Sequence, residues 1–507
     1  MSHGRARLNL ANDPPAPRPA HGLSCRLVIL ALSATLMAAA AAPAAGRDAT
    51  IQVRIDPRIE LCSIIFRLAG FNEYSQGKVT SYLDDIEAHF GPHRDHAVIA
   101  MAQSLRAERG ISFDACMALA IHFADDGSLQ PAAPLDDQSL QLYGDGRWTP
   151  ERAASFMTQV RDFAAATDFE AFCEAHRALY ELTELRMRAM IDAHVDEGWF
   201  GRFYGVEPTA PFTVVPGLVN GGSNYGPKFI APGRADGNEH LYAIIGVWRT
   251  DDAGEPAFGE EFVGTIIHEF NHSFVNHVVE AHRDELATAG ELIQRAVAEP
   301  MKRQAYGHWK TIIDESVVRA AVVRYLRAHA DEARVKQEIK AQEDRSFLWI
   351  APLEQLLGEY EADRAAYPVF ADFMPRVVTF FDEYAPGMEA VVAERERAME
   401  AKRPQIVSIE PAAGSEQVGP GATAIVITFD RPMRGGYSLM ISELGPFPPA
   451  GEPSWNDDRT VFTLPVTLAP DTVYAYAINS ENGGSFRSAA DDVPAKRQVV
   501  WFRTGKE

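Results

Sequence analysis

Cysteine and positive charge are both scarce in this chain of 507 residues. It contains only 4 cysteines, and no C-x-x-C pair occurs among them, which disfavours a cysteine-ligated zinc site. Lys and Arg number 48 against 70 Asp and Glu, so the formal net charge is -22. Such an acidic surface argues against a nucleic-acid partner, because those proteins present a basic face to phosphates. It also disfavours binding to an anionic membrane.

Beyond its first 46 residues, the chain lacks an apolar run long enough to cross a membrane. The N-terminal segment carries four arginines, then an apolar stretch over residues 27–45 that ends in small residues such as Ala42 and Ala44. This order is typical of a secretory signal peptide. We expect residues 1–46 to be cleaved, with an uncleaved anchor as the alternative. The mature protein is then exported, either periplasmic or at the extracellular cell surface, with no membrane partner.

Three cysteines remain after the expected signal peptide: Cys62, Cys116 and Cys173. An exported chain can pair two of them in a disulfide, which leaves one thiol over. All three have apolar, helical surroundings, and buried free thiols suit such surroundings equally well. The sequence leaves their disulfide status open.

The hydrophobic pattern divides the rest of the chain into two parts. Up to about residue 402, apolar residues recur mainly at helical spacing, and strand-like runs appear only around residues 210–250. After Pro404 the period changes to two, which is typical of short antiparallel strands. Helices are expected over residues 79–90, 97–108, 114–123, 150–164, 169–185, 260–280, 308–329, 352–366, 369–383 and 387–402. Strands are expected over residues 212–216, 241–248, 406–411, 424–429, 460–464, 473–477 and 499–502.

These patterns predict an α+β protein of two domains. Residues 47–402 are expected to form a mostly helical domain with a small mixed sheet. Within it, residues 47–205 form a helical N-terminal part and residues 206–402 form the core. Residues 403–507 are expected to form an all-β, Ig-like sandwich.

One short motif in the core carries recognisable chemistry. His268, Glu269 and His272 form the pattern H-E-x-x-H in a stretch that is otherwise mostly apolar. Residues four apart lie on one face of a helix, so the two imidazoles can reach one zinc ion. Glu269 then lies close enough to act as general base towards a zinc-activated water. Burying such polar groups without partners is costly, which favours a built metal site over a chance match.

A catalytic zinc ion needs a third protein ligand and one open position. His277 is the nearest histidine, but its spacing does not fit the extended H-E-x-x-H-x-x-G-x-x-H pattern. Glu315 is the best candidate, because a carboxylate in so apolar a helix is costly unless it is paired or coordinating. Arg319, four residues on, could orient it, and a simple Glu315–Arg319 surface pair is the alternative. Glu359 and Glu361 are weaker candidates for the third ligand.

A zinc hydrolase also needs a donor aimed at the developing oxyanion. The sequence offers Tyr225, His308 and Tyr360, with Tyr242 and Tyr306 as further possibilities, and does not choose between them. Tyr225 lies in a Gly/Asn-rich segment before the strand expected over residues 241–248. We expect that strand to be a sheet edge, which could pair with an extended peptide substrate.

The chain resembles a group of bacterial exported proteins known only as a domain of unknown function, with a gluzincin-like H-E-x-x-H core. The resemblance extends over about residues 50–400 and implies a zincin-type α+β fold. It implies zinc bound by His268, His272 and Glu315, with Glu269 as general base. One departure is His277, where the family leads us to expect proline. The stretches that carry the resemblance are residues 60–70, 110–115, 224–226, 268–276 and 315–320.

The tail of the chain is similar to the Ig-like modules that are often appended to bacterial exported proteins. The stretches that carry this likeness are residues 411–414 and 426–433. Such a module implies attachment to a cell-surface component or to substrate. It carries no catalytic motif in this sequence.

We therefore expect an exported zinc-dependent metallopeptidase, a gluzincin-like hydrolase that acts on a peptide or protein substrate. One alternative is a non-catalytic cell-surface binding protein on a zincin scaffold, in which the Ig-like module recognises the partner. An intact Glu269 argues against it, because metal retention alone does not need this residue. The other alternative is a zinc amidase that acts on a cell-wall amide, and the same zinc ligands would serve it.

Overall fold

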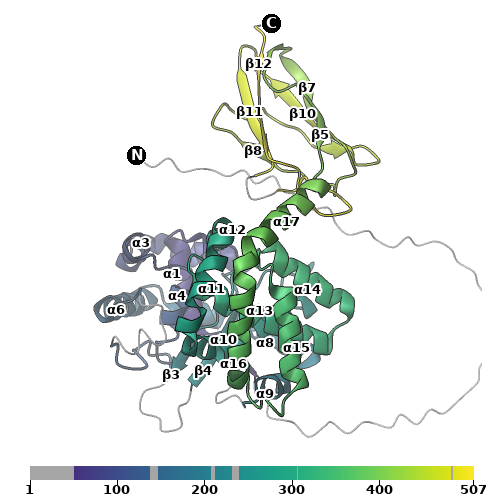
Figure 1. Ribbon diagram of the computed structural model, residues 1–507. Helices are drawn as coiled ribbons and strands as arrows, with labels where there is room; N and C mark the ends of the chain where they lie inside the picture. Colours follow the sequence, from purple (N-terminus) through teal and green to yellow (C-terminus); the bar gives the residue numbers. More distant parts are fainter. Residues whose placement is uncertain are drawn as a thin grey trace, which may run out of the picture. The chain divides into compact units, whose positions relative to one another are not determined.

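Two compact units make up the described part of the chain, whose elements are drawn in Figure 1. The computed structural model describes residues 51–136, 147–206, 212–230, 239–304, 306–480 and 484–506. Described residues up to Glu389 form one unit, and those from Ala390 onward form the other. Within these ranges, none of the helices has the length and hydropathy that crossing a bilayer requires. The expected signal peptide over residues 1–46 lies outside the described residues.

The larger unit is mostly helical and holds one small sheet, so the α+β prediction is confirmed. Its helices are α1 (Pro57–Leu68), α2 (Thr80–Phe90), α3 (Ala97–Arg109), α4 (Asp114–Ala120), α6 (Pro150–Ala166), α7 (Phe169–Ala175), α8 (Arg177–His194), α9 (Gly198–Tyr204), α10 (Val263–Ala281), α11 (Arg283–Ala296), α12 (Ala298–Arg303), α13 (Trp309–His329), α14 (Glu332–Asp344), α15 (Ile350–Ala362) and α16 (Phe370–Tyr384). Its strands are β1 (Ile51–Val53), β2 (Phe212–Gly217), β3 (Lys228–Ile230) and β4 (Glu239–Gly246).

Several helices begin at side chains that satisfy the first free backbone N–H groups. Asp56 accepts a hydrogen bond from the backbone N–H of Arg58 at the start of α1, and proline follows the cap. Thr149 caps α6 in the same way. Proline suits the first helical position because its fixed φ is helical and its missing N–H has no partner there. These local signals explain why the observed start of α6 coincides with the predicted one.

One predicted helix, over residues 169–185, is broken in the structure into α7 and α8. The break falls at His176, whose Nδ1 lies 2.8 Å from the carbonyl oxygen of Phe172. Its Nε2 lies 3.1 Å from a carboxylate oxygen of Asp85 on α2. The imidazole thus competes with backbone N–H groups for a helical carbonyl oxygen, and α2 holds it in place through Asp85. Hydrophobic spacing alone does not reveal such a break.

The sheet has the strand order β1-β2-β4-β3. β2 pairs in parallel with both β1 and β4, and β3 pairs antiparallel with β4. The strand predicted over residues 241–248 therefore lies inside the sheet, so the prediction that it forms a sheet edge is wrong. The edge is covered because the chain folds back: Tyr225 pairs with Ile244, and β3 continues along the same strand. Gly246 permits this close passage, since an added Cβ would lie 2.0 Å from the carbonyl oxygen of Gly221.

Helix α10 is packed between the sheet and α13, which positions the H-E-x-x-H motif. Phe270 stacks against Phe212 of β2, with ring centroids 4.1 Å apart. Asn271 is fully buried and accepts a hydrogen bond of 2.9 Å from the hydroxyl of Tyr204 on α9. Its amide also donates to the carbonyl oxygen of Val318 on α13. These contacts hold α10 and α13 in register, so residues on their facing sides have defined separations.

A buried carboxylate, Glu60 on α1, joins two parts of the larger unit. It accepts hydrogen bonds from the hydroxyl of Tyr82 at 2.9 Å and from the backbone N–H of Leu218 at 3.2 Å. Burial raises the pKa of Glu60 to about 7, although these two hydrogen bonds act in the opposite direction. The folded state therefore takes up a proton at this site more readily than the unfolded chain.

Replacing Glu60 with glutamine is expected to flatten the pH dependence of stability. The pKa is raised on folding from an ordinary 4.5 to about 7, so the stabilising contribution is present below pH 4.5 and is lost as pH rises through 7. Over that window the wild type should lose on the order of 3 kcal/mol of unfolding free energy relative to E60Q. Denaturant unfolding at several pH values measures both slopes. Parallel slopes in the two proteins would refute this role.

The three cysteines of the described chain are free thiols. Cys62 and Cys116 are buried, and Cys173 is partly buried. Burial raises the pKa of each of these thiols. The structure therefore shows the buried free thiols that the apolar surroundings suggested, with no disulfide among these three residues.

The smaller unit is rich in strands that form two sheets around one core. The sheet orders are β5-β7-β10-β9 and β6-β12-β11-β8. Phe462 from the first sheet and Tyr476 from the second belong to the same hydrophobic cluster. The described pairs are antiparallel except that of β6 with β12, which differs from the fully antiparallel arrangement expected. The elements are α17 (Met388–Lys402), β5 (Ile406–Glu410), β6 (Ser415–Val418), β7 (Gly421–Phe429), β8 (Leu439–Ile441), β9 (Ser454–Trp455), β10 (Val461–Leu468), β11 (Val473–Ile478) and β12 (Gln498–Thr504).

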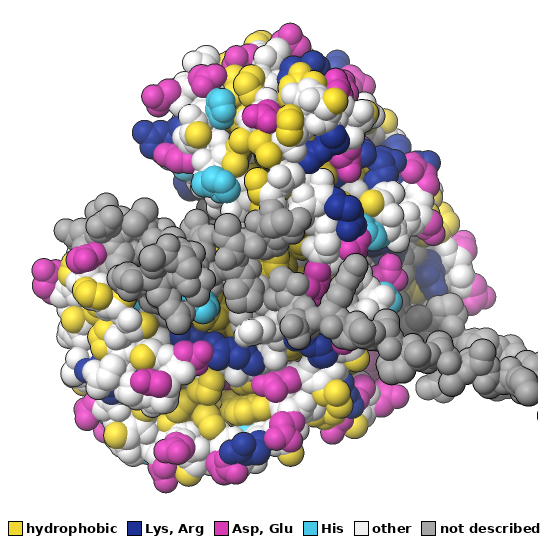
Figure 2. Space-filling model, turned by 90° about the horizontal axis from the view of Figure 1, so that it is seen from below, with side chains coloured by type: hydrophobic (Ala, Val, Ile, Leu, Met, Phe, Trp, Pro, Cys, Tyr) yellow, Lys and Arg dark blue, Asp and Glu magenta, His cyan; other side chains and the backbone are white. Residues whose placement is uncertain are grey.

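Charged side chains of both signs are mixed over the face that Figure 2 shows. Acidic groups are spread among lysine and arginine rather than gathered into one field. No large patch of acidic side chains alone stands out on this face.

Candidate metal centre

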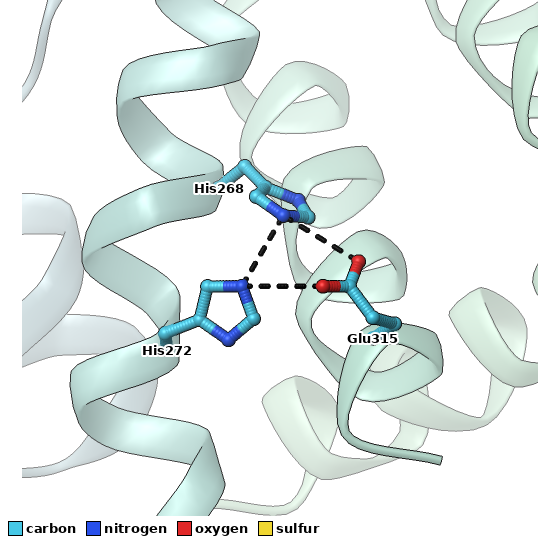
Figure 3. Close-up of side chains that lie close together, drawn as sticks. All are labelled: His268, His272 and Glu315. Carbon is cyan, nitrogen blue, oxygen red and sulfur yellow. Dashed lines mark hydrogen bonds and ion pairs between the residues drawn. The ribbon is translucent and has the colours of Figure 1, made fainter. Parts of the chain in front are cut away.

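Two neighbouring helices supply the residues of the candidate site (Figure 3). α10 carries the H-E-x-x-H motif, and its apolar residues Ile266, Ile267 and Phe270 are fully buried. α13 carries Glu315, also buried, in a helix with apolar residues on most sides. The spacing of four residues brings His268 and His272 to one face of α10, opposite Glu315.

His268, His272 and Glu315 form a group that could hold a metal ion. The Nε2 atoms of the two histidines are 3.3 Å apart. Each lies 3.5 Å from one oxygen of the Glu315 carboxylate. Figure 3 shows both rings and the carboxylate converging on one point. The structure thus brings together the three residues that the sequence predicted as metal ligands.

The orientation of His272 is set by a residue one helical turn further along α10. His272 Nδ1 lies 3.1 Å from the side-chain oxygen of Asn276, an acceptor, so Nδ1 carries a proton. Nε2 is then the atom that faces Glu315 and the second imidazole. A partner on the outer nitrogen is the usual way in which a protein orients a histidine that binds a metal.

The charges of the group are tightly coupled. Burial lowers the pKa of His268 well below its usual range, which keeps that imidazole neutral. For His272, burial acts in the same direction, but the Glu315 carboxylate outweighs it and raises the pKa to about 9. Burial alone would raise the pKa of Glu315, yet Arg319 and the two imidazoles hold it well below its ordinary value. A metal that binds here would displace the proton on His272 Nε2.

Arg319 supports Glu315 from the next turn of α13. Its guanidinium lies 2.7 Å from Glu315 Oε2, and both side chains are more than nine-tenths buried. The guanidinium also donates to the side-chain oxygen of Gln342 at 2.7 Å and to the hydroxyl of Tyr306 at 2.8 Å. Its flat face lies 4.7 Å from the ring centre of Phe347. Arg319 is therefore a buried, multiply held cation, and the alternative of a simple surface pair with Glu315 is wrong.

Glu315 Oε2 is the polar atom in this group that a metal would satisfy. Although it lies close to Arg319, it accepts no hydrogen bond of acceptable geometry within the described residues. A buried acceptor without such a bond is costly. The fit of two imidazole nitrogens and this carboxylate to a divalent cation follows from the chemistry of the donors.

Glu269, the second residue of the motif, points to a different side of α10 from the two histidines. Its side chain is buried, and burial raises its pKa to about 7, with His272 lowering it and Glu315 raising it. Gly226 of the Gly/Asn-rich segment lies directly against it: an added Cβ would be 2.8 Å from Glu269 Oε2. The absence of a side chain at this glycine leaves space for the carboxylate.

The three side chains that the sequence offered as oxyanion donors make their contacts outside the group of His268, His272 and Glu315. The ring of Tyr225 is buried in the core against Tyr74, with centroids 6.2 Å apart. His308 is exposed and caps α13, accepting from the backbone N–H of Lys310. Tyr360 is fully buried on α15 against Phe203. The structure does not bring these side chains to His268, His272 and Glu315.

The weaker candidates for the third ligand are also accounted for. Glu359 pairs with Arg376 at 2.8 Å, and Glu361 pairs with Arg324. Neither belongs to the group that could hold a metal ion. The residues that sequence reasoning missed are Asn276, Gln342 and Gly226, and Tyr306 was only a further possibility. Of these, only Asn276 had a local signal, because it lies four residues after His272 on the same helix face.

Comparison with known proteins identifies a family for this chain but does not indicate an activity. The model of the family "Domain of unknown function (DUF4932)" matches residues 51–380. No curated protein matches the chain. Among solved structures, the "Crystal structure of the S-layer protein rSbsC(31-844)" is similar over 78% of this chain and 46% of that chain, with 11% identity and a TM-score of 0.15. The match spans less than half of that S-layer protein, and so low a score carries no argument.

Proposed function

This chain belongs to the DUF4932 family, whose function is unknown, and we propose that it is an exported zinc-dependent metallopeptidase. The observation that supports the proposal most directly is the convergence of His268, His272 and Glu315, with the buried Glu269 next to His268 in the same helix. Three protein ligands with an open position are typical of catalytic zinc sites, whereas structural sites have four. The H-E-x-x-H pattern adds the general base that a purely structural site does not need.

The separations within the group suit zinc. Bonds of about 2.0–2.1 Å at tetrahedral angles place neighbouring ligand atoms roughly 3.3–3.4 Å apart. The nitrogen–nitrogen separation here is 3.3 Å, and the two nitrogen–oxygen separations are 3.5 Å. Both imidazoles and the carboxylate can therefore reach one ion without rearrangement of α10 or α13. A bound Zn²⁺ would supply Lewis acidity, which polarises a carbonyl group and makes water a stronger acid.

In this proposal the protein's own residues handle the proton. Glu269 accepts a proton from the attacking water as its oxygen bonds to the carbonyl carbon, then delivers it to the leaving nitrogen as the C–N bond breaks. The products are one carboxylic acid and one amine. A pKa near 7 suits both halves of this task, because the carboxylate can take up and release a proton near neutral pH. Arg319 keeps Glu315 ionised and in place as a ligand.

The test is cleavage of a diverse peptide library by the purified chain, with its metal content measured on the same sample. We expect about one zinc per chain, cleavage that stops on addition of 1,10-phenanthroline, and recovery when zinc is restored. Bound zinc without peptide cleavage would instead favour the amidase alternative, with cell-wall fragments as the next substrates. A well-folded chain that takes up no zinc would contradict the proposal.

Export and attachment complete the proposal. The basic, apolar and small-residue order of residues 1–46 favours export to the periplasm or the cell surface. The two-sheet arrangement of the smaller unit is compatible with an Ig-like module that binds a cell-surface component. We propose that this unit holds the enzyme near its peptide or protein substrate.

A further inference from the structure

We propose that the hydroxyl of Tyr306 donates a hydrogen bond to the substrate oxygen that becomes negatively charged during hydrolysis; the assignment rests on the metallopeptidase function proposed above. Tyr306 lies just before α13 and its side chain is half-buried. It is thus both held by the protein and open to a ligand. The reaction needs such a donor because charge develops on the carbonyl oxygen when water attacks.

A short chain of contacts connects Tyr306 to the candidate metal ligands. Its hydroxyl oxygen lies 2.8 Å from a guanidinium nitrogen of Arg319. The same nitrogen lies 2.7 Å from Glu315 Oε2, which is 3.5 Å from His268 Nε2. The Tyr306 hydroxyl is therefore connected to the proposed ligand Glu315 through a single side chain, that of Arg319. Its ring is fixed by Phe347, with ring centroids 6.0 Å apart, and by the guanidinium above it.

The direction of the hydrogen bond to Arg319 leaves the phenol with a proton to donate. A guanidinium has only donors, so the Tyr306 oxygen must accept. The O–H of Tyr306 then requires an acceptor of its own, and no described residue provides one. The neighbouring cation also polarises the phenol, which makes it a stronger donor. Tyr306 therefore offers an O–H donor close to the proposed metal ligands, and the substrate oxyanion would accept its hydrogen bond.

The protonation state of Tyr306 agrees with this role. Burial raises its pKa to about 12, with Glu315 and Glu269 acting in the same direction and Arg319 in the opposite one. The phenol therefore keeps its proton throughout the neutral range.

The variant that tests the proposal is Tyr306→Phe, which keeps the ring and removes only the hydroxyl. We expect kcat to fall about 10²–10³-fold, the range seen when one oxyanion donor is lost. Affinity for a phosphonamidate analogue of the cleaved peptide should fall by a similar factor, since its tetrahedral anion imitates the transition state. Titration calorimetry on zinc-loaded protein measures this affinity without catalysis.

Two further readouts separate a donor from a residue that merely supports Arg319. Zinc affinity, measured by chelator competition, should be the same in the wild type and Tyr306→Phe. Affinity for the uncleaved peptide, measured in a Glu269→Gln background, should change little. If zinc and both ligands weaken together, Tyr306 is structural and the proposal is overturned. It is overturned equally if the variant retains full kcat and full analogue affinity.

The other tyrosines provide a direct comparison. Tyr225→Phe and Tyr360→Phe remove hydroxyls that the structure places away from the metal ligands. Loss of analogue affinity in one of these, with Tyr306→Phe unaffected, would assign the donor elsewhere. If the library yields no cleaved peptide, the function itself has failed. In that case N-phosphoryl-leucinamide replaces the analogue, and equal affinity for wild type and Tyr306→Phe overturns the assignment of the donor.

Discussion

Replacing Glu269 with glutamine is expected to abolish most peptide hydrolysis while the protein keeps its zinc. The amide preserves the size of the side chain but cannot take a proton from water, and general acid–base catalysis typically contributes about 10²–10⁴-fold. We therefore expect kcat to fall by that factor. The proposed metal ligands are other residues, so zinc content should remain as in the wild type. Single-turnover cleavage and metal analysis on the same preparation measure both quantities.

A matched control for this prediction lies on the same helix. Glu280 is exposed near the end of α10, where it pairs with Arg283 at 2.8 Å. Glu280→Gln makes the same chemical change away from the site and should leave kcat unaltered. Full activity of Glu269→Gln would remove Glu269 from the mechanism. Loss of zinc in that variant would show that Glu269 acts on metal binding rather than on the proton.

Replacing Arg319 with methionine is expected to destabilise the zinc-free protein strongly and the zinc-loaded protein much less. Removing one partner of a buried ion pair typically costs about 3–5 kcal/mol, because the other charge remains buried. Here the remaining charge is Glu315, which is only 7% exposed. A bound zinc ion would neutralise that carboxylate in place of the guanidinium. Denaturant unfolding with and without zinc measures the two losses.

The control for Arg319→Met is Arg283→Met. Arg283 pairs with Glu280 at 2.8 Å, and its side chain is 45% exposed. Such pairs contribute about 0.3–0.5 kcal/mol on helix surfaces, so the change in unfolding free energy should be small with or without zinc. An equal, large loss for Arg319→Met in both metal states would mean that Arg319 stabilises the fold through Gln342 and Phe347 rather than through Glu315.

Several helices with one buried face were predictable from the sequence. α2 and α3 show apolar residues at helical spacing, and their bounds agree closely with the prediction. α1 was recognised only as helical surroundings of Cys62, without bounds, because nearly all its residues are buried and no polar face marks its period. α9 was missed because it is only 7 residues long. The break at His176 depends on Asp85, which lies on another helix and is invisible to local spacing.

The motif and Glu315 could be found in the sequence because each places polar side chains in an otherwise apolar helix. His268, Glu269 and Glu315 are polar residues inside apolar helices, and burial of such groups requires partners. The convergence of His268, His272 and Glu315 agrees with the prediction because the facing sides of α10 and α13 are packed together. The oxyanion donor could not be chosen in the same way. Several tyrosines were equally plausible in sequence, and only their positions in the fold distinguish Tyr306 from Tyr225.

The sequence by itself determined the α+β class, the change from helical to alternating hydrophobic spacing after Pro404, and the three residues of the candidate metal group. These follow from local periodicity and from the cost of burying polar side chains, which are properties of short stretches of chain. Tertiary structure alone decided that β4 is internal and that Arg319 is a buried cation. It also decided that Gly226 lies against Glu269. These are contacts between segments far apart in sequence, and their energies arise only when packing brings the segments together.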